Sequence, residues 1–375
     1  MRPVKVVIVT SSYPMHPDDS AAAAGLFVRG FALEMARQGH GVRVLTQRRP
    51  GRTLDDPELR VTRYSWSGDK PLSSLKPQDP RDFLAILSVL GNGYLALDQL
   101  VARERPDLVL AMWALPAGLL ARMILARRGV PYRVWVLGSD IWGYGRQPLT
   151  RWLVRLILRG SERVFADGVE LATEAESISS RSCGFLPSSR ELPRGSGRPP
   201  ELDPGLINFL FVGRLHRNKG ADLLIEAVAR MKPDERENLH FFIFGRGPQE
   251  NNLKRLVARR RLNGAISFMG YADRRRTASF LEHCHALVVP SRIESIPVIL
   301  SDAAQAGCPV VVSDVGDMRA VVTQYGNGIV VTLSPSSLEQ GILQMARKGR
   351  RDFTAGCGRM AGAFSVQASV KGILE

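Results

Sequence analysis

Residues 209–220 read FLFVGRLHRNKG: an apolar run, then a loop that carries Arg214 and Lys219, then a helical pattern that begins near Ala221. The loop that leads from a strand into a helix presents unpaired backbone N–H groups at the positive end of the helix, which favours an anion there. The charges of Arg214 and Lys219 suit a diphosphate. An alternative remains open, because both residues could be solvated loop cations in a protein of net charge +15.

The same alternation of strand and helix patterns runs through the whole chain of 375 residues. Short runs of Val, Ile and Leu are typical of parallel strands that are buried on both faces. The predicted strands are Val4–Val9, Val42–Leu45, Leu108–Met112, Tyr132–Leu137, Arg163–Ala166, Ile207–Val212, His240–Gly245, Ala265–Gly270, Ala286–Pro290, Val310–Ser313 and Gly328–Thr332. This pattern predicts an α/β protein of two doubly wound, Rossmann-like domains that face each other across a cleft.

Residues 187–205 lie between the two patterns and are dense in proline, glycine and serine, which favours a linker. The predicted domains are therefore 1–186 and 206–350, with a C-terminal helix within 351–375. The N-terminal apolar run is too short for a signal peptide, and the best candidate for a membrane-spanning helix, Phe83 to Leu100, is interrupted by polar residues and glycines. We therefore expect a cytoplasmic protein without a transmembrane helix. The spacing of the four cysteines predicts neither disulfides nor a zinc site.

A second segment, residues 286–314, places acids after a predicted strand. Glu294 follows the strand, Pro297 suits the first turn of a helix, and Asp302 lies within that helix. Two acids could then reach one ligand. The alternative is that Glu294 caps the helix and Asp302 is an exposed helical acid.

Together these motifs resemble glycosyltransferase family 4, the group 1 glycosyltransferases of GT-B fold, over nearly the whole chain. The family's Gly-Arg and Lys-Gly pairs match Gly213-Arg214 and Lys219-Gly220. Its two acids, with seven residues between them, match Glu294 and Asp302 before the segment Gly307 to Val311. The N-terminal half is similar at Gly25 to Val28 and at Gly138-Ser139-Asp140.

The resemblance implies a retaining transfer of a sugar from a nucleotide-sugar donor, linked to UDP, GDP or ADP, to a glycan or lipid-linked acceptor. Arg214 and Lys219 would hold the diphosphate, Glu294 the sugar and Asp302 the ribose, with backbone N–H groups of Ser295 and Ile296 as further contacts. The catalytic residues would be Glu294, Arg214 and Lys219. The resemblance also implies that residues 1–186 form the acceptor side, with Gly25, Gly138, Ser139 and Asp140 at the cleft, and that the C-terminal helix returns to that domain.

No cofactor is expected, because cations and helix ends neutralise the diphosphate without a metal. The acid pairs Asp18-Asp19 and Asp55-Asp56 do not follow predicted strands, as a metal clamp would. The leaving phosphate oxygen would itself take the proton of the acceptor hydroxyl.

Three residues depart from the family pattern. Leu137 stands where many members have a histidine, Pro297 where a glycine is frequent, and Asp302 where the second acid is usually glutamate. These changes define either an active subgroup or a weakened, nucleotide-sugar-binding module. We favour the subgroup because Arg214, Lys219 and Glu294 are all retained.

Other function classes are disfavoured. The first predicted strand is not followed by G-x-G-x-x-G, and there is no G-x-x-x-x-G-K-[ST] loop, so neither a dehydrogenase nor a P-loop phosphotransferase is indicated. Nucleic-acid binding is a weaker alternative, because no reading motif or interleaved aromatics accompany the basic charge.

The basic charge has a further candidate partner in an anionic membrane. Arg151, Arg155 and Arg159 recur at helical spacing opposite Leu153 and Ile157. The helix is either an ordinary surface helix or a contact for peripheral attachment to the inner face of the cytoplasmic membrane. The sequence leaves the nucleotide, sugar, acceptor, linkage and oligomeric state undecided.

Overall fold

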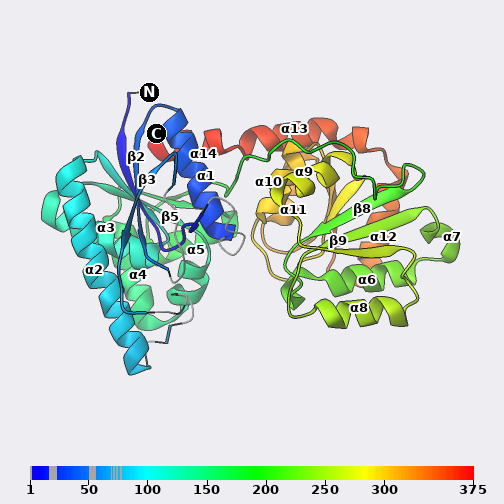
Figure 1. The fold of residues 1–375 in the computed structure, drawn as a ribbon, viewed down its shortest axis with the longest axis horizontal. Helices are drawn as coiled ribbons and strands as arrows, with labels where there is room; N and C mark the ends of the chain where they lie inside the picture. Colours follow the sequence, from blue (N-terminus) through cyan, green and yellow to red (C-terminus); the bar gives the residue numbers. More distant parts are fainter. Residues whose placement is uncertain are drawn as a thin grey trace. The chain divides into compact units, whose positions relative to one another are not determined.

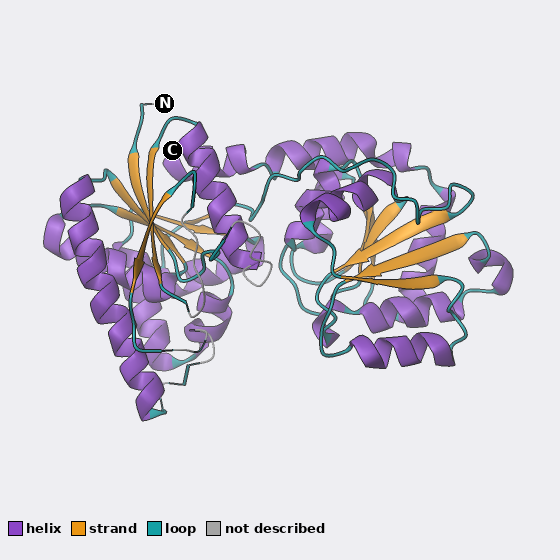
Figure 2. Cartoon of the chain, in the orientation of Figure 1, coloured by secondary structure: helices purple, strands orange, loops and turns teal. Residues whose placement is uncertain are grey.

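The computed structural model describes residues 2–16, 23–49, 56–68, 70, 72, 75–76 and 78–375, and Asp18, Asp19 and Asp55 lie outside them. The described chain divides into two compact units, Met1–Ser188 with Val366–Glu375, and Ser189–Ser365. Each unit contains one sheet with helices on both faces (Figures 1 and 2). The predicted α/β fold class, with two doubly wound domains, is confirmed.

The first unit has a parallel sheet in the order β3-β2-β1-β4-β5-β6-β7. Its strands are β1 Lys5–Val9, β2 Gly41–Gln47, β3 Arg60–Tyr64, β4 Leu108–Met112, β5 Tyr132–Val136, β6 Arg163–Ala166 and β7 Cys183–Phe185. Its α-helices are α1 Ala23–Arg37, α2 Pro80–Glu104, α3 Leu119–Arg128, α4 Pro148–Gly160, α5 Val169–Ser179 and α14 Val366–Leu374. The apolar cores show that α2 to α5 cover one face of this sheet, whereas α1 and α14 cover the other.

The second unit has a parallel sheet in the order β10-β9-β8-β11-β12-β13. Its strands are β8 Ile207–Val212, β9 Leu239–Phe244, β10 Ile266–Gly270, β11 Ala286–Val289, β12 Val310–Ser313 and β13 Gly328–Val331. Its α-helices are α6 Ala221–Arg230, α7 Pro233–Arg236, α8 Glu250–Arg259, α9 Arg274–His283, α10 Val298–Gln305, α11 Met318–Tyr325, α12 Pro335–Arg347 and α13 Thr354–Ala363. Helices α6, α8 and α12 pack on one face, and α9, α10 and α11 on the other.

Every predicted strand forms, with ends that differ by at most one residue from the prediction except at β2, which is longer. Strands β3 and β7, the two edge strands of the first sheet, were not predicted. Strand β7 has only three residues, and β3 is partly exposed along most of its length. Neither therefore has the apolar run of a central strand. All four cysteines are free and buried.

The predicted linker behaves differently from a flexible spacer. Residues 187–205 have no regular secondary structure, but from Ser189 onward they belong to the second unit. The Gly195 N–H donates to Glu282 and the Ser196 N–H to Ser279, both on α9, and Leu202 is buried. The chain returns to the first unit only after Ser365, so α14 belongs there but α13 does not.

Helix α2 continues through the glycines and polar residues that were expected to interrupt it. Among the described residues, it alone is long and apolar enough to cross a membrane by length and composition, a test that packed helices also pass. Leu97, Leu100 and Val101 are buried against the sheet, and Asp98 pairs with two arginines of α3. Helix α2 is therefore a packed helix of the first unit, and its outer face is exposed.

Candidate functional site

The strand order of the second sheet reverses between β8 and β11. Ligands of open α/β sheets bind at such a switch point, outside the carboxyl ends of the strands, because the two following chain segments diverge there. Gly213, Arg214 and Lys219 follow β8, and Glu294, Ser295 and Ile296 follow β11. The topology therefore brings both motifs to the same point.

Lys219 and Glu294 meet directly, since Lys219 Nζ donates to Glu294 Oε2. The pair joins the two loops at the switch point. Both side chains are partly exposed, 34% for Lys219 and 19% for Glu294. A ligand can therefore reach both charges, and a diphosphate oxygen could replace the carboxylate as the partner of the ammonium.

Two glycines allow the loops to approach this closely. Gly220 has a φ of +71°, and a Cβ placed there would lie 1.8 Å from the carbonyl oxygen of Pro290. Gly316 follows β12 with a φ of +52°, and its Cβ would lie 2.0 Å from the carbonyl oxygen of Glu294. Only glycine tolerates both a positive φ and a carbonyl oxygen at the place where a Cβ would lie. A hydrogen bond of 2.7 Å from the Arg292 N–H to the Asn218 carbonyl oxygen also joins the loops after β11 and β8.

Arg214 and the N–H groups before α10 supply further donors. Arg214 is exposed, and within the part of the chain that the structure describes its guanidinium has no protein partner. The N–H groups of Ser295 and Ile296 likewise donate to no described acceptor. The site thus presents two cations, one carboxylate and free amide donors, a set suited to a diphosphate joined to a hydroxyl-rich group.

Asp302 lies apart from this set of groups. Its side chain is 0% exposed, and both carboxylate oxygens accept from the guanidinium of Arg190. It is therefore not the exposed helical acid of the alternative interpretation. The carboxylate has no open surface in this structure. Its predicted contact with ribose is untested and stays a prediction.

The predicted residues of the first unit lie near the carboxyl edge of its own sheet. Gly25 lies in the first turn of α1, and a Cβ there would lie 2.9 Å from the backbone of Tyr13. Gly138 has a φ of +99° and precedes the turn that contains Ser139. Asp140 is fully buried and accepts from Ala114 N at 2.8 Å and from Leu137 N at 3.3 Å. Asp140 therefore holds together the loops that follow β4 and β5.

Burial raises the pKa of Asp140 to about 6, and the backbone N–H donors oppose this shift. The folded protein thus holds the proton of this carboxyl group over a pH range in which the unfolded chain has lost it.

Sequence reasoning missed Arg190 and Arg292. Arg292 pairs with Asp222 of α6 at 2.6 Å and donates to Arg217 O at 2.7 Å, so it supports the loop that carries Lys219. Arg190 lies in a segment that was interpreted as a linker, where nothing in the sequence indicates a partner 112 residues away.

The first unit contains a cavity of about 790 Å³ beside β3, and its lining includes Arg43, Arg60 and Glu104. We place the candidate site at the switch point, because the motif residues converge there and none of them lines the cavity. Among the described residues, no cluster of His, Cys, Asp or Glu could hold a metal ion.

Two family models match the chain. The model described as glycosyl transferases group 1 matches residues 198–353, and the model described as glycosyl transferase 4-like domain matches residues 23–179. Together they cover most of both units, including the switch point between β8 and β11.

Individual proteins are similar as well. An uncharacterized glycosyltransferase of Methanocaldococcus jannaschii is 23% identical over 69% of this chain and 71% of its own length. A D-inositol 3-phosphate glycosyltransferase of Geodermatophilus obscurus is 32% identical, over only 45% of this chain and 39% of that protein. Anabaena HepE, solved in complex with UDP, has the same fold with a TM-score of 0.74, 14% identity, and coverage of 99% of this chain and 98% of that chain.

Replacing Gly220 by alanine should destabilise the second unit. The added Cβ would be both strained at positive φ and in contact with the Pro290 carbonyl, so we expect a loss of at least about 2 kcal/mol in the free energy of unfolding. Urea denaturation measures this. Gly264→Ala is the control, because a Cβ there meets nothing within 4 Å. Equal stability of the two variants would contradict the close packing of the two loops.

The raised pKa of Asp140 predicts a pH-dependent stability. Between the unfolded pKa, near 3.9, and the folded pKa of about 6, the folded state binds more protons, so stability falls as pH rises. The unfolding free energy of the wild type minus that of Asp140→Asn should therefore fall by roughly 2 kcal/mol between pH 4 and pH 7. Urea denaturation at a series of pH values measures this difference. A constant difference would show that the carboxyl group ionises normally.

Proposed function

Because the chain belongs to the group 1 glycosyltransferases, family 4, we propose that it transfers a sugar from a nucleotide-sugar donor, bound at the switch point of the second unit, to a glycan or lipid-linked acceptor. One observation carries the proposal: the ion pair of Lys219 and Glu294 joins the loops after β8 and β11 where this fold binds ligands. HepE, a protein of the same fold, was solved with UDP and with UDP-glucose, which supports a nucleotide-sugar as the donor.

In the proposed complex the donor diphosphate displaces Glu294 from Lys219. Arg214 and Lys219 then contact the phosphate oxygens, and the N–H groups of Ser295 and Ile296 add donors. Glu294, released from the ammonium, accepts a hydrogen bond from a hydroxyl of the donor sugar. The positive groups stabilise the negative charge that develops on the leaving diphosphate, an electrostatic contribution that is usually large in such catalysis.

We propose retention of configuration. The bond from the anomeric carbon to the phosphate oxygen breaks, and the acceptor oxygen bonds to that carbon on the same face. The acceptor proton passes to the departing phosphate oxygen, so the step needs no side-chain base. It also needs no metal in this proposal, because Arg214, Lys219 and backbone N–H groups supply the positive charge.

The donor nucleotide and the acceptor are matters for experiment. UDP-, GDP- and ADP-sugars all fit the proposed diphosphate contacts. Inositol phosphate is one acceptor to test, because several similar proteins are D-inositol 3-phosphate glycosyltransferases, although the matches cover less than half of those proteins. A role in polysaccharide or cell-envelope biosynthesis is consistent with such acceptors.

The second candidate function is a nucleotide-sugar-binding module without turnover. The burial of Asp302 and the loss of one N–H donor at Pro297 favour it. The exposed cations and the reachable carboxylate of Glu294 favour catalysis, because binding alone does not require an acid beside the diphosphate. Assays of turnover and of binding separate the two functions.

We also propose peripheral contact with an anionic membrane on the cytoplasmic side. The inner face of α4 packs on the sheet through Val154, Ile157 and Leu158, as expected of a surface helix. Its outer face, however, exposes Leu149 by 73% and Trp152 by 57% beside several arginines. Exposed apolar residues next to cations are typical of helices that rest on acidic lipids.

Helices α2 and α3 cover the same face of the sheet as α4 and add to this surface. Helix α2 exposes four large apolar side chains, Phe83, Leu84, Leu87 and Leu95, and α3 exposes Met123. Isolated exposed apolar residues are ordinary, but a group of them on adjacent helices indicates an interaction surface. A lipid-linked acceptor would be presented at such a surface.

Nucleoside diphosphate release from UDP-, GDP- and ADP-sugars tests the proposed reaction. We expect release from one donor class, and a fall of at least about 100-fold in kcat/KM for Arg214→Ala and for Glu294→Ala, since each removes a charged contact to the transition state. Arg259→Ala is the control, because it removes an exposed arginine of α8 in the same unit. Binding of a donor without release with any acceptor, lipid-linked ones included, would favour the binding module. No binding at all would refute the donor site.

Vesicle sedimentation tests the membrane contact. The double variant Leu149→Ser/Trp152→Ser should bind vesicles of anionic phospholipid at least about tenfold more weakly, because each apolar side chain contributes on the order of 1.5–3 kcal/mol when buried. Added salt should weaken wild-type binding, because charge attracts the protein to the lipid. Leu333→Ser, an exposed leucine of the second unit, is the control. Vesicle binding that changes neither with added salt nor with the double substitution would contradict the proposal.

A further inference from the structure

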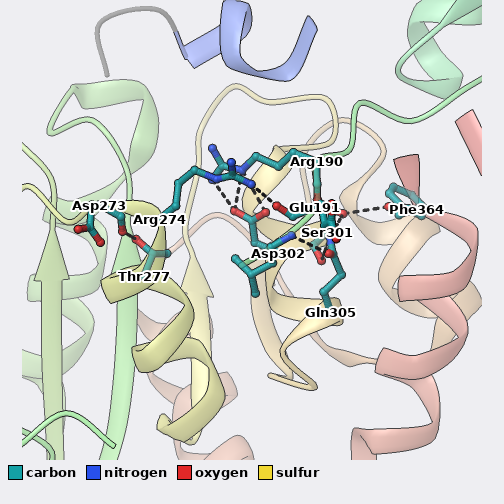
Figure 3. A network of polar contacts seen from close by, with 10 residues as sticks. Arg190, Glu191, Asp273, Arg274, Thr277, Ser301, Asp302, Gln305 and Phe364 are labelled. Carbon is teal, nitrogen blue, oxygen red and sulfur yellow. Dashed lines mark hydrogen bonds and ion pairs between the residues drawn. The ribbon is translucent and has the colours of Figure 1, made fainter. Parts of the chain in front are cut away.

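A network of polar contacts on α10 holds the two places where the chain crosses between the units. The chain enters the second unit between Ser188 and Ser189 and leaves it between Ser365 and Val366. Arg190 lies just after the first crossing, and Phe364 lies just before the second. Figure 3 shows both residues beside the same helix, with contacts to its side chains.

Three residues of α10 make these contacts. Asp302 binds the Arg190 guanidinium through both oxygens, at 3.1 Å from Nε to Oδ1 and 2.5 Å from Nη2 to Oδ2. Gln305 Nε2 donates to Arg190 O at 2.8 Å, and Gln305 Oε1 accepts from Leu192 N at 2.9 Å. Ser301 Oγ donates to Phe364 O at 3.0 Å within the core.

These contacts form one connected group. Gln305 Nε2 also lies 3.1 Å from Ser301 Oγ, so the bonds at the first crossing join those at the second. The spacing of 301, 302 and 305 places all three side chains on one face of the helix. Helix α10 begins at Val298, directly after the loop that carries Glu294.

We propose that Arg190 and Asp302 form a permanent clamp, in which Asp302 acts as a positioning residue for α10 and for the first crossing and makes no contact with the donor ribose. The carboxylate is fully buried and both oxygens already have a charged partner. Opening the pair to a ribose would separate a fully buried carboxylate from the guanidinium of Arg190, whose side chain is 23% exposed, and removing the partner of a buried charge is costly. Asp302 raises the pKa of Arg190 against the effect of burial, so the guanidinium stays charged.

The clamp affects the reaction through Glu294, and this part of the inference rests on the proposed function. A shift of α10 would move the loop between β11 and the helix, and with it the carboxylate that faces Lys219. Misplacing a catalytic group by about 1 Å can cost on the order of 100-fold in rate. Breaking the clamp should therefore lower kcat more than it raises the KM for the donor.

Hydrogen exchange of the ligand-free full chain tests the clamp itself. The variants are Asp302→Asn and the double variant Arg190→Ala/Asp302→Asn. The double variant leaves no unpaired charge, so it can be measured if the single variant folds poorly. Exchange at the amides of 189–196, which include Leu192, should rise at least about tenfold. Glu339→Gln is the matched control, because it breaks another ion pair of this unit, with Arg230 of α6. No rise beyond that of the control would overturn the proposal.

Nucleotide binding tests the absence of a ribose contact. We expect that Asp302→Asn changes the ratio of affinities for a nucleoside diphosphate and its 2′-deoxy and 3′-deoxy forms by less than about threefold. A preference of tenfold or more for the ribonucleotide that disappears in Asp302→Asn would overturn the proposal, because a hydrogen bond to a charged group has about that effect. In turnover assays, Asp302→Asn should lower kcat about tenfold and change the donor KM by less than about threefold relative to the wild type. A change confined to KM would also overturn it.

The two proposals fail in different ways. If the wild type binds no nucleotide, the proposed function fails, and hydrogen exchange still decides whether the clamp exists. If the wild type releases nucleoside diphosphate and hydrogen exchange is unchanged in both variants, the clamp fails and the proposed function stands.

Discussion

The parallel pairing of every strand in the two sheets is the constraint on which the rest of the structure depends. Parallel strands have their carboxyl ends at one edge, so each loop that leads into a helix emerges there. The order of strands reverses once in each sheet, and in the second sheet this places the loops after β8 and β11 side by side. Two motifs that lie 75 residues apart in the chain meet as the pair Lys219 and Glu294 for this reason.

Close backbone approach then determines how these loops meet. Gly220 and Gly316 allow carbonyl oxygens to lie where a Cβ would otherwise stand. The ion pair itself contributes little to stability, because both side chains are partly exposed and solvent screens them. Its importance is geometric: backbone packing fixes a cation and an acid beside each other where a ligand can separate them. A diphosphate bound here, as proposed, would find this charge already in place, so little of its binding energy would be spent on ordering the loops.

The sequence predicted the central strands because burial on both faces requires continuous apolar runs, as in β4 and β8. It did not predict β3 and β7, because β3 is partly exposed along most of its length and β7 has only three residues, so neither edge strand needs such a run. The meeting of Lys219 and Glu294 was predictable, because topology fixes where loops after parallel strands lie. The pairing of Arg190 with Asp302 was not, because an irregular segment follows no periodic rule and its partner is decided only by packing.

The three departures from the family pattern have a common feature in the structure. Leu137 is half-buried and packs on the core beside α1 and α14, and its N–H donates to Asp140. Pro297 stands at the start of α10 with a φ of −69°, the angle its ring requires, and Asp302 holds Arg190. Each residue lies in the packed backbone of its own unit and is not an exposed polar contact, whereas the cations after β8 match the family pattern. The proposed stabilisation of a leaving diphosphate uses those cations, whereas the changed positions are the ones that the family resemblance assigns to the sugar and the ribose. This division favours an active enzyme with altered donor recognition over a module that has lost its chemistry.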